Sequence, residues 1–229
     1  QLEDVVWPLY EKLKRKFLDE KLFEPTVLYG YWPCRSDDNT LLIFDESEGY
    51  NSEDEINREP LDIVMPRAKE KFDFPRQSKQ PHRAISDFFH ADRHDVIALT
   101  CVSAGSKLSE VEREIYERNE YTEYYQIHGL GVALAEALAE IAHKQIRLDL
   151  NISEGEGSSL SDVQMNKYQG CRYSFGYAAC PDLELNRPLF NLLKPEEFGI
   201  ELSETFQIHP EQSTSALAVY HPNASYYNI

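Results

Sequence analysis

The sequence is poor in cysteine and in positive charge, and it contains no long apolar run. Its few cysteines lack CxxC spacing and form no His/Cys cluster typical of zinc, so we expect free thiols and no metal site at Cys34, Cys101, Cys171 and Cys180. Only 23 Lys and Arg face 40 Asp and Glu, which gives a formal net charge of -17. This balance excludes non-specific binding to nucleic acid or to an anionic membrane, because both require a basic face.

No segment approaches the roughly 20 consecutive apolar residues of a transmembrane helix, and no signal-peptide pattern opens the chain. We therefore predict a cytoplasmic protein whose partners include neither a membrane nor nucleic acid.

Familiar catalytic motifs are also missing. The chain has no GxSxG elbow, no GxxxxGK[ST] phosphate loop and no HExxH zinc motif. The pair Gly129 and Gly131 lies within a helical pattern rather than after a strand, so it does not predict a dinucleotide site. Since the sequence identifies no partner for His90, His94 or His128, we interpret them as structural. We expect the chain to supply no catalytic residue.

The sequence contains enough hydrophobic residues to form a core. A chain of 229 residues that is 41% hydrophobic can form one large domain or two small ones. Helical spacing predicts a first helix ending near Asp19. Two β-type runs at 27–31 and 41–44, separated by a turn-rich stretch at 35–39, predict a hairpin, and 95–102 reads as a buried strand. Strands do not alternate regularly with helices, so we predict an α+β fold: a single mixed domain with an antiparallel sheet and long helices.

A long helical region is expected in the middle of the chain. Ser109 with Glu112 predicts a capping box near its start. Its apolar stripe is predicted to comprise Leu130, Leu134, Leu138 and Ile141. Glu140 and Lys144 are spaced as a surface ion pair. Glu136 lies off the stripe between small residues that would let another element approach, although most helix glutamates are simply solvated.

Two charged segments stand out. Residues 45–59 hold seven acids and one arginine, which is typical of a solvated loop. Residues 67–83 hold six Lys and Arg against two acids. This basic segment either neutralises nearby acids or forms a docking surface for an acidic partner.

The segment RYSFGYAACPD, residues 172–182, combines one arginine with small and aromatic residues. Gly176 allows close approach to the backbone, aromatic rings offer flat faces, and the Arg172 guanidinium suits a carboxylate. An aromatic pair, Tyr226 and Tyr227, lies near the C-terminus and is placed to close over the same ligand.

Several motifs carry a family resemblance. The segments RYSFGYAACPD, ELSETFQIHP and YHPNASYY resemble the C-terminal activation domain of cobalamin-dependent methionine synthase. Upstream, VLYGYWPCRSDDNTLLIF, FPRQ followed by SDFF, DVIALTCVSAG and the helical stretch YTEYYQIHGLGVALAEALAEIAHKQIR resemble the same domain in the same order. The resemblance spans nearly the whole chain.

The resemblance implies a site for S-adenosylmethionine. In the family, the arginine that matches Arg172 contacts the amino-acid portion of this ligand, and an acid contacts it at the place of Glu136. Ser174 stands where the family commonly has alanine and where main-chain groups face the ligand. The full set that the resemblance implies as ligand contacts is Glu136, Arg172, Ser174, Gly176, Tyr177, Tyr226 and Tyr227.

The resemblance also implies partners. Reduced cobalt of cobalamin, bound on a neighbouring domain of the same enzyme, attacks the methyl group that the activation domain positions, and a flavodoxin-like protein donates the electron. We therefore expect residues 1–229 to be an activation domain truncated at its N-terminus, lacking the upstream acid that holds the ribose. Two rivals remain: a docking module that contacts the cobalamin domain and a reductase, and an independent methyltransferase, which the missing nucleotide loop disfavours.

Overall fold

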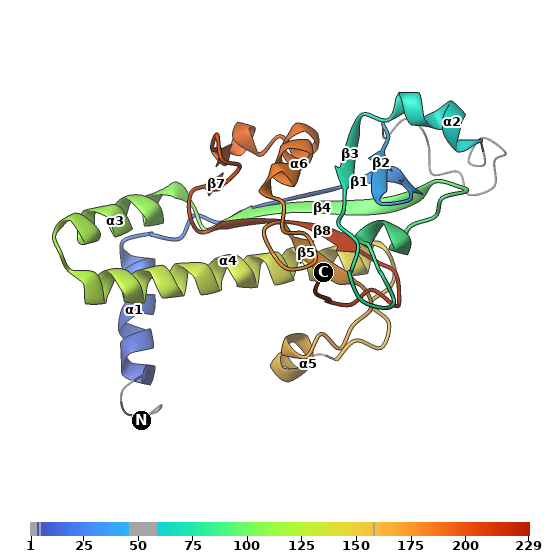
Figure 1. Ribbon diagram of the computed structural model, residues 1–229. Coiled ribbons are helices and arrows are strands. Elements are labelled where there is room, and N and C mark those ends of the chain that lie inside the picture. The colour runs from blue at the N-terminus through green and yellow to red at the C-terminus, as the bar shows by residue number, and fades with distance from the viewer. Residues whose placement is uncertain (1–3, 5, 46–58, 158) are drawn as a thin grey trace.

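The computed structural model describes residues 4, 6–45, 59–157 and 159–229. Within these residues, six strands form one antiparallel sheet in the order β3-β2-β1-β4-β8-β5 (Figure 1). The strands are β1 (Thr26–Asp37), β2 (Thr40–Ile43), β3 (Glu70–Asp73), β4 (Asp95–Ser103), β5 (Cys171–Ser174) and β8 (Ser213–Val219). A small separate hairpin pairs β6 (Glu201–Leu202) with β7 (Ile208–His209).

Helices lie on both faces of the sheet (Figure 1). They are α1 (Trp7–Asp19), α2 (Leu61–Val64), α3 (Ser106–Glu117), α4 (Tyr121–Asp149), α5 (Leu160–Gln164) and α6 (Asn186–Leu193). Short 3₁₀ helices are η4 (Met65–Arg67), η5 (Ile85–Phe88), η6 (Leu183–Leu185) and η7 (Pro195–Phe198). The long helix α4 crosses one face over β4, β8 and β1, whereas α6 packs on the opposite face. The first helix ends at Asp19 as predicted.

Alternation along the central strands explains this layering. In β4, Ile97 and Leu99 belong to the large core cluster that includes Leu189 and Phe190 of α6. Ala98 on the opposite face packs with Ala218 of β8 and Ile146 of α4. Successive strand residues face opposite sides, and small residues on the α4 side let the long helix approach closely.

The hydrophobic face of α4 differs from the predicted leucine stripe. Its buried residues are Ile127, Gly131, Ala135, Leu138, Ala139, Ala142, His143, Ile146 and Arg147. Ile141, predicted to be apolar core, is 61% exposed. Leu130 and Leu134 are half-buried. They pack against a hydrophobic cluster that includes residues of α1 and α3, and not against the sheet. The prediction is confirmed for Leu138, which packs with Val102 of β4, and is wrong for Ile141, because mainly alanines mark where this helix touches the sheet.

The predicted hairpin is confirmed, but its turn is shorter than expected. Strand β1 continues through Arg35, Ser36 and Asp37 and pairs with β2 up to Asp37 and Thr40. The buried Arg35 donates from Nη1 to the Glu59 carbonyl at 2.7 Å and from Nη2 to the Ala91 carbonyl at 2.6 Å. Two carbonyl partners therefore let a charged residue occupy a strand position that the sequence pattern assigned to a turn.

The predicted capping box at Ser109 and Glu112 is wrong. Helix α3 begins three residues earlier, after Gly105. Ser109 Oγ instead donates to Gln212 Oε1 at 2.9 Å, and Glu112 is buried. The acidic segment 45–59 lies largely outside the described residues.

None of the described helices combines the length and the apolar composition that a bilayer-spanning helix requires.

Candidate functional site

A cavity of about 460 Å³ opens beside edge strand β5. Six of the seven residues predicted from the sequence line it, and they come from three segments far apart in the chain. The complete lining is Glu136, Arg172, Tyr173, Ser174, Tyr177, Ala178, Ala179, Tyr226, Tyr227 and Asn228. Helix α4, strand β5 with its following loop, and the C-terminal segment therefore meet at one place.

Strand alternation sorts the β5 side chains. Cys171 and Tyr173 are buried in the large core, whereas Arg172 and Ser174 are only partly buried and point to the opposite face. Because α4 covers that face, the register brings Arg172 against Glu136. The distance from Arg172 Nη2 to Glu136 Oε2 is 3.1 Å.

The Arg172 guanidinium is not fully used by this contact. Its side chain is 12% exposed, and the buried Nη1 makes no hydrogen bond with any residue that the structure describes. A buried donor without an acceptor is costly, and in native proteins it usually has a partner. Arg172 lines the cavity and keeps an unused donor, which a carboxylate or other anion would satisfy.

Gly176 is the one predicted residue that does not line the cavity. Its φ of +86° is a left-handed conformation, and its N–H donates to the Cys180 carbonyl at 2.8 Å. A Cβ at this position would lie 2.9 Å from Leu183 Cδ2. Gly176 thus shapes the turn that places Tyr177, Ala178 and Ala179 against the cavity.

Tyr226 and Tyr227 flank the buried Tyr173. The Tyr173 ring centroid lies 5.9 Å from that of Tyr226 and 6.1 Å from that of Tyr227. Tyr226 remains 58% exposed, and the Arg172 cation lies close enough to oppose the rise of its pKa. Tyr227 packs toward the large core, and its hydroxyl is buried. Of the two rings, Tyr226 is the one beside Arg172.

A buried polar layer lies behind Arg172. Arg147 of α4 is almost fully buried, stacks on the Tyr168 ring at 3.7 Å and pairs with Glu156 at 2.6 Å. The Tyr168 hydroxyl donates to Glu140 Oε2 at 3.2 Å. Glu140 also pairs with Arg147 at 3.5 Å, so the predicted Glu140–Lys144 surface pair is not what positions this carboxylate.

His143 belongs to the same layer. Its ring packs edge-on against Tyr168, with centroids 5.3 Å apart. Burial, together with the nearby cations Arg147 and Arg172, lowers the pKa of His143 to about 3. The imidazole is therefore neutral at physiological pH, so it adds no cation next to Arg172.

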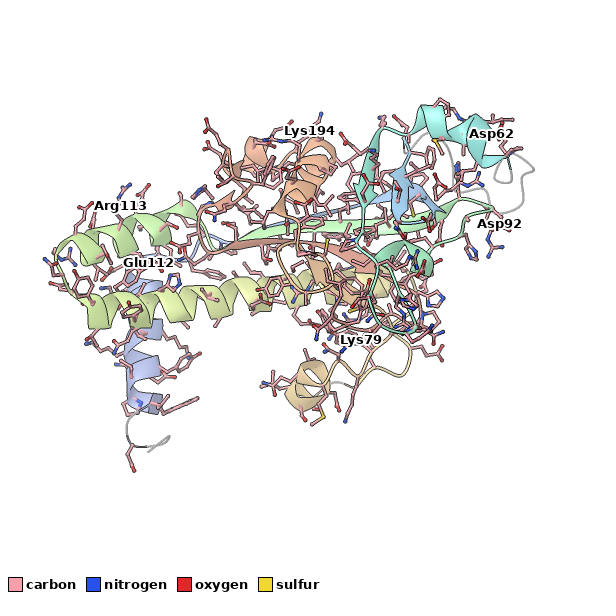
Figure 2. All side chains as sticks on the ribbon, in the orientation of Figure 1. Asp62, Lys79, Asp92, Glu112, Arg113 and Lys194 are labelled. Atoms are coloured by element: carbon pink, nitrogen blue, oxygen red, sulfur yellow. The ribbon has the colours of Figure 1, made fainter. Side chains whose placement is uncertain are left out.

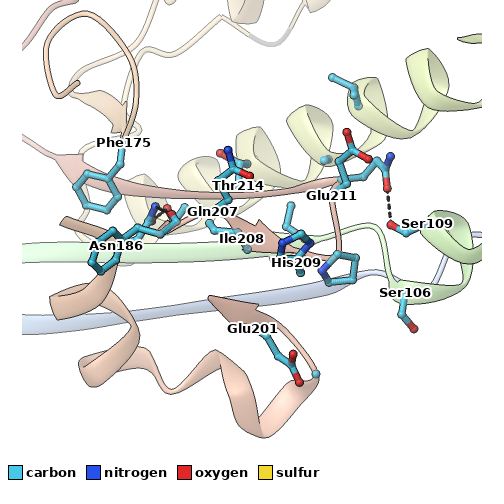
Figure 3. A pocket seen from close by; sticks show the side chains of 18 of the residues that line it. Ser106, Ser109, Phe175, Asn186, Glu201, Gln207, Ile208, His209, Glu211 and Thr214 are labelled. Atoms are coloured by element: carbon cyan, nitrogen blue, oxygen red, sulfur yellow. Dashed lines mark hydrogen bonds between the residues drawn. The ribbon is translucent and has the colours of Figure 1, made fainter. Parts of the chain in front are cut away.

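A second hollow of about 960 Å³ lies between α3, α4 and the β6–β7 hairpin (Figure 3). Glu136 and Tyr177 line both hollows. Figure 3 shows Ser109, Glu201 and Glu211 around the second one. Sequence analysis gave no sign of this hollow, because its lining is spread over many segments of ordinary polar residues.

One cluster among the described residues has the ligand types for a metal: Glu112, His128 and Glu211. Gln212 Nε2 donates to Glu112 Oε2 at 2.6 Å and lies 3.2 Å from His128 Nδ1. Burial raises the pKa of Glu112, while His128 and Gln212 oppose the rise. Figure 2 shows Glu112 on the side of α3 that faces α4. His128 thus has partners that sequence alone could not identify, and they hold α3, α4 and the start of β8 together.

The basic segment 67–83 has close acidic neighbours. Arg67 pairs with Glu59 and Lys69 with Asp45. Arg76 Nη1 lies 2.7 Å from Asp87 Oδ2. These pairs favour the interpretation that the segment neutralises nearby acids.

Four lining residues lie outside the seven ligand contacts that the resemblance implies: Tyr173, Ala178, Ala179 and Asn228. The first three lie inside the motif that the sequence singled out, and their spacing around Arg172 was a usable signal. No signal in the sequence identified Asn228, because only the path of the C-terminal segment brings it to the cavity.

Known proteins are similar to this chain in sequence and in fold. Residues 8–229 match the family described as vitamin B12 dependent methionine synthase, activation domain. Methionine synthase of Mycobacterium tuberculosis is 36% identical over 230 residues, covering 95% of this chain and 18% of the relative. Methionine synthase of Mycobacterium leprae is 35% identical over 218 residues, covering 89% and 17%. The chain thus spans less than a fifth of the length of these relatives.

A solved crystal structure of the MetH reactivation domain bound to AdoHcy superposes with a TM-score of 0.83 at 23% identity, covering 99% of this chain and 70% of that chain. This likeness confirms the predicted α+β fold with its antiparallel sheet. Together with the sequence matches over 8–229, it supports one conclusion: the chain belongs to the activation-domain family of vitamin B12-dependent methionine synthases.

Proposed function

We propose that the cavity beside β5 binds S-adenosylmethionine and positions its methyl group for transfer to cobalamin. The observation that carries this proposal is that Arg172, which lines a cavity large enough for a small molecule, keeps a buried Nη1 donor with no hydrogen-bond partner among the described residues. The ligand carboxylate would accept from Nη1, in a charge-assisted hydrogen bond.

Glu136 would then face the α-ammonium of the same ligand. Its carboxylate lies 3.1 Å from Arg172, and in an amino acid the ammonium is attached one carbon away from the carboxylate. Opposite charges on the protein, held this close together, match the zwitterionic head of the ligand. Tyr177 and Tyr226 offer ring faces to the remainder, and Ser174 brings main chain close to it.

The chemistry on cobalamin belongs to a partner. A cob(I)alamin cofactor on another domain would supply the nucleophile, and this chain would bind and orient the methyl donor. We propose the cobalamin domain of the same enzyme and a flavodoxin-like electron donor as partners. Because Arg67, Lys69 and Arg76 pair with nearby acids, this segment is a poor candidate for the donor's docking surface.

Calorimetric titration of S-adenosylmethionine tests the proposal. The wild-type protein should bind, and Arg172→Ala should weaken binding by roughly 30-fold or more, because a charged hydrogen bond is lost. Arg172→Lys should restore little, since a lysine ammonium is a point charge and cannot copy the planar guanidinium. Arg15→Ala, an exposed arginine of α1, serves as the control for loss of one positive charge.

Equal affinity in wild type and Arg172→Ala would reject the site. Absence of binding by the wild-type protein would favour the docking-module alternative, which predicts association with a cobalamin domain that Arg172→Ala leaves unchanged.

A further inference from the structure

The C-terminal segment 221–229 brings Tyr226 and Tyr227 to the cavity without belonging to a helix or a strand. Main-chain ladders therefore do not fix its position. Its path must be set by individual contacts, and these identify which residues place the two rings.

The first contacts hold the start of the segment. The His221 ring lies 5.6 Å from Phe88, and the Ala224 N–H donates to the His221 carbonyl at 2.9 Å. The Tyr173 hydroxyl donates to the Ser225 carbonyl at 2.8 Å. These contacts end immediately before Tyr226.

The last contact lies beyond the two tyrosines. Gln77, in the loop between β3 and η5, donates from Nε2 to the Asn228 carbonyl at 2.9 Å. Figure 1 shows the C-terminus beside this loop, and Figure 2 labels Lys79 on it. Attachments at Ser225 and Asn228 thus flank Tyr226 and Tyr227, whose rings also pack on Tyr173.

The Gln77 side chain is itself held in place. Its Oε1 accepts from the Arg83 N–H at 3.3 Å, and its own N–H donates to the Arg83 carbonyl at 2.9 Å. Arg83 in turn reaches Ser225 Oγ from Nη1 at 3.4 Å and lies over the Phe88 ring. Gln77 therefore joins the two ends of the 77–83 loop through its main-chain N–H and its side-chain amide. The same side chain ties the C-terminal segment to this loop.

We infer that Gln77 is a positioning residue for ligand binding: through the Asn228 carbonyl it holds Tyr226 and Tyr227 against the cavity. This inference rests on the proposed function for its effect on affinity. It also gives the basic segment an internal role, because the loop that carries Gln77 and Arg83 supports the site instead of meeting a partner.

The test is Gln77→Glu with Gln80→Glu as its matched control. The glutamate at 77 keeps an oxygen for the Arg83 N–H but replaces the Nε2 donor with an oxygen that repels the Asn228 carbonyl. Gln80 is exposed on the same loop. Its variant therefore carries the same charge change but leaves the hydrogen bond from Gln77 to the Asn228 carbonyl intact. Two properties are measured for each protein: S-adenosylmethionine affinity by calorimetry, and the ¹⁹F spectrum of a fluorotyrosine at position 226.

We expect Gln77→Glu to weaken binding roughly 3- to 10-fold, as for loss of one hydrogen bond. Without ligand, the fluorine signal at position 226 should narrow as the ring becomes more mobile, and it should shift as the ring contact with Tyr173 loosens. Gln80→Glu should match the wild type in both measurements, and the thermal midpoints should agree.

A fluorine signal in Gln77→Glu identical to that of the wild type overturns the inference. A changed signal with unchanged affinity also overturns it, because the tether would then not serve the ligand. If the wild type binds no S-adenosylmethionine, the proposed function fails, and the fluorine spectra alone decide whether Gln77 holds Tyr226.

Discussion

Arg172 of β5 and Glu136 of α4 form an ion pair, with 3.1 Å between Nη2 and Oε2, at the wall of the cavity. The pair leaves Arg172 Nη1 as a buried donor without a hydrogen bond to the described residues. On the proposed function, a zwitterionic ligand would satisfy this donor and still meet the Glu136 carboxylate, so the pair would bind both charges of the ligand as well as joining strand and helix.

This relationship predicts how Glu136→Gln discriminates between ligands. If Glu136 faces the α-ammonium, the variant should lower the affinities for S-adenosylmethionine and S-adenosylhomocysteine by a similar factor, roughly 10-fold, because both ligands carry that ammonium. Calorimetry with the two ligands measures it. Glu123→Gln, which removes another ion-paired glutamate of α4, is the control. Weakening of S-adenosylmethionine alone would assign Glu136 to the sulfonium instead.

Gly176→Ala should reduce both stability and ligand affinity. Alanine at a φ of +86° is strained by about 1–2 kcal/mol, and its Cβ would meet Leu183 Cδ2 at 2.9 Å. Gly199→Ala provides the control, because Gly199 has a φ of +75° with open space around the added Cβ. Chemical denaturation should show both variants destabilised, and calorimetry should show affinity lost only in Gly176→Ala. Equal ligand affinities would mean that the turn at Gly176 does not shape the site.

His143 predicts a pH dependence of folding. Its pKa is about 3 in the folded protein against 6.5 in the unfolded chain, so between these values the unfolded chain binds more protons. The stabilisation is complete above pH 6.5 and is lost as the pH falls. Between pH 7 and pH 5 this one group should cost about 2 kcal/mol of unfolding free energy.

Urea denaturation of wild type and His143→Gln at pH 7 and pH 5 measures this effect. The variant should lose about 2 kcal/mol less than the wild type over that range. His209→Gln, at an exposed position in β7, should behave like the wild type. If all three proteins lose the same unfolding free energy between pH 7 and pH 5, the pH dependence arises from groups other than His143.

Two glycines of α4 predict opposite responses to alanine. Gly129 is exposed with nothing within 4 Å of an added Cβ, so Gly129→Ala should stabilise the protein by about 0.5–1 kcal/mol through helix propensity. At Gly131 a Cβ would lie 2.6 Å from Leu108 Cδ2 and 3.0 Å from Gln212 Cγ, so Gly131→Ala should destabilise by about 1–3 kcal/mol. Thermal unfolding compares them. Stabilisation by both would show that α3 and α4 can move apart.

The sequence by itself determined a substantial part of the site. The motif at 172–179 combines an arginine, small residues and rings, and strand alternation alone places Arg172 and Ser174 on one face of β5. The terminal tyrosine pair was visible in the same way. These signals are local, because they depend on neighbouring residues and on a period of two.

Only the tertiary structure decided which distant groups support the site. The layer of Arg147, Tyr168 and Glu140 and the contact between Gln77 and Asn228 join residues separated by up to 151 positions. The core face of α4 likewise depends on what packs against it: alanines and Gly131 are buried where the sheet and α3 come close, whereas Ile141 faces solvent. Helical periodicity identifies possible faces, but close packing against a particular neighbour selects one of them.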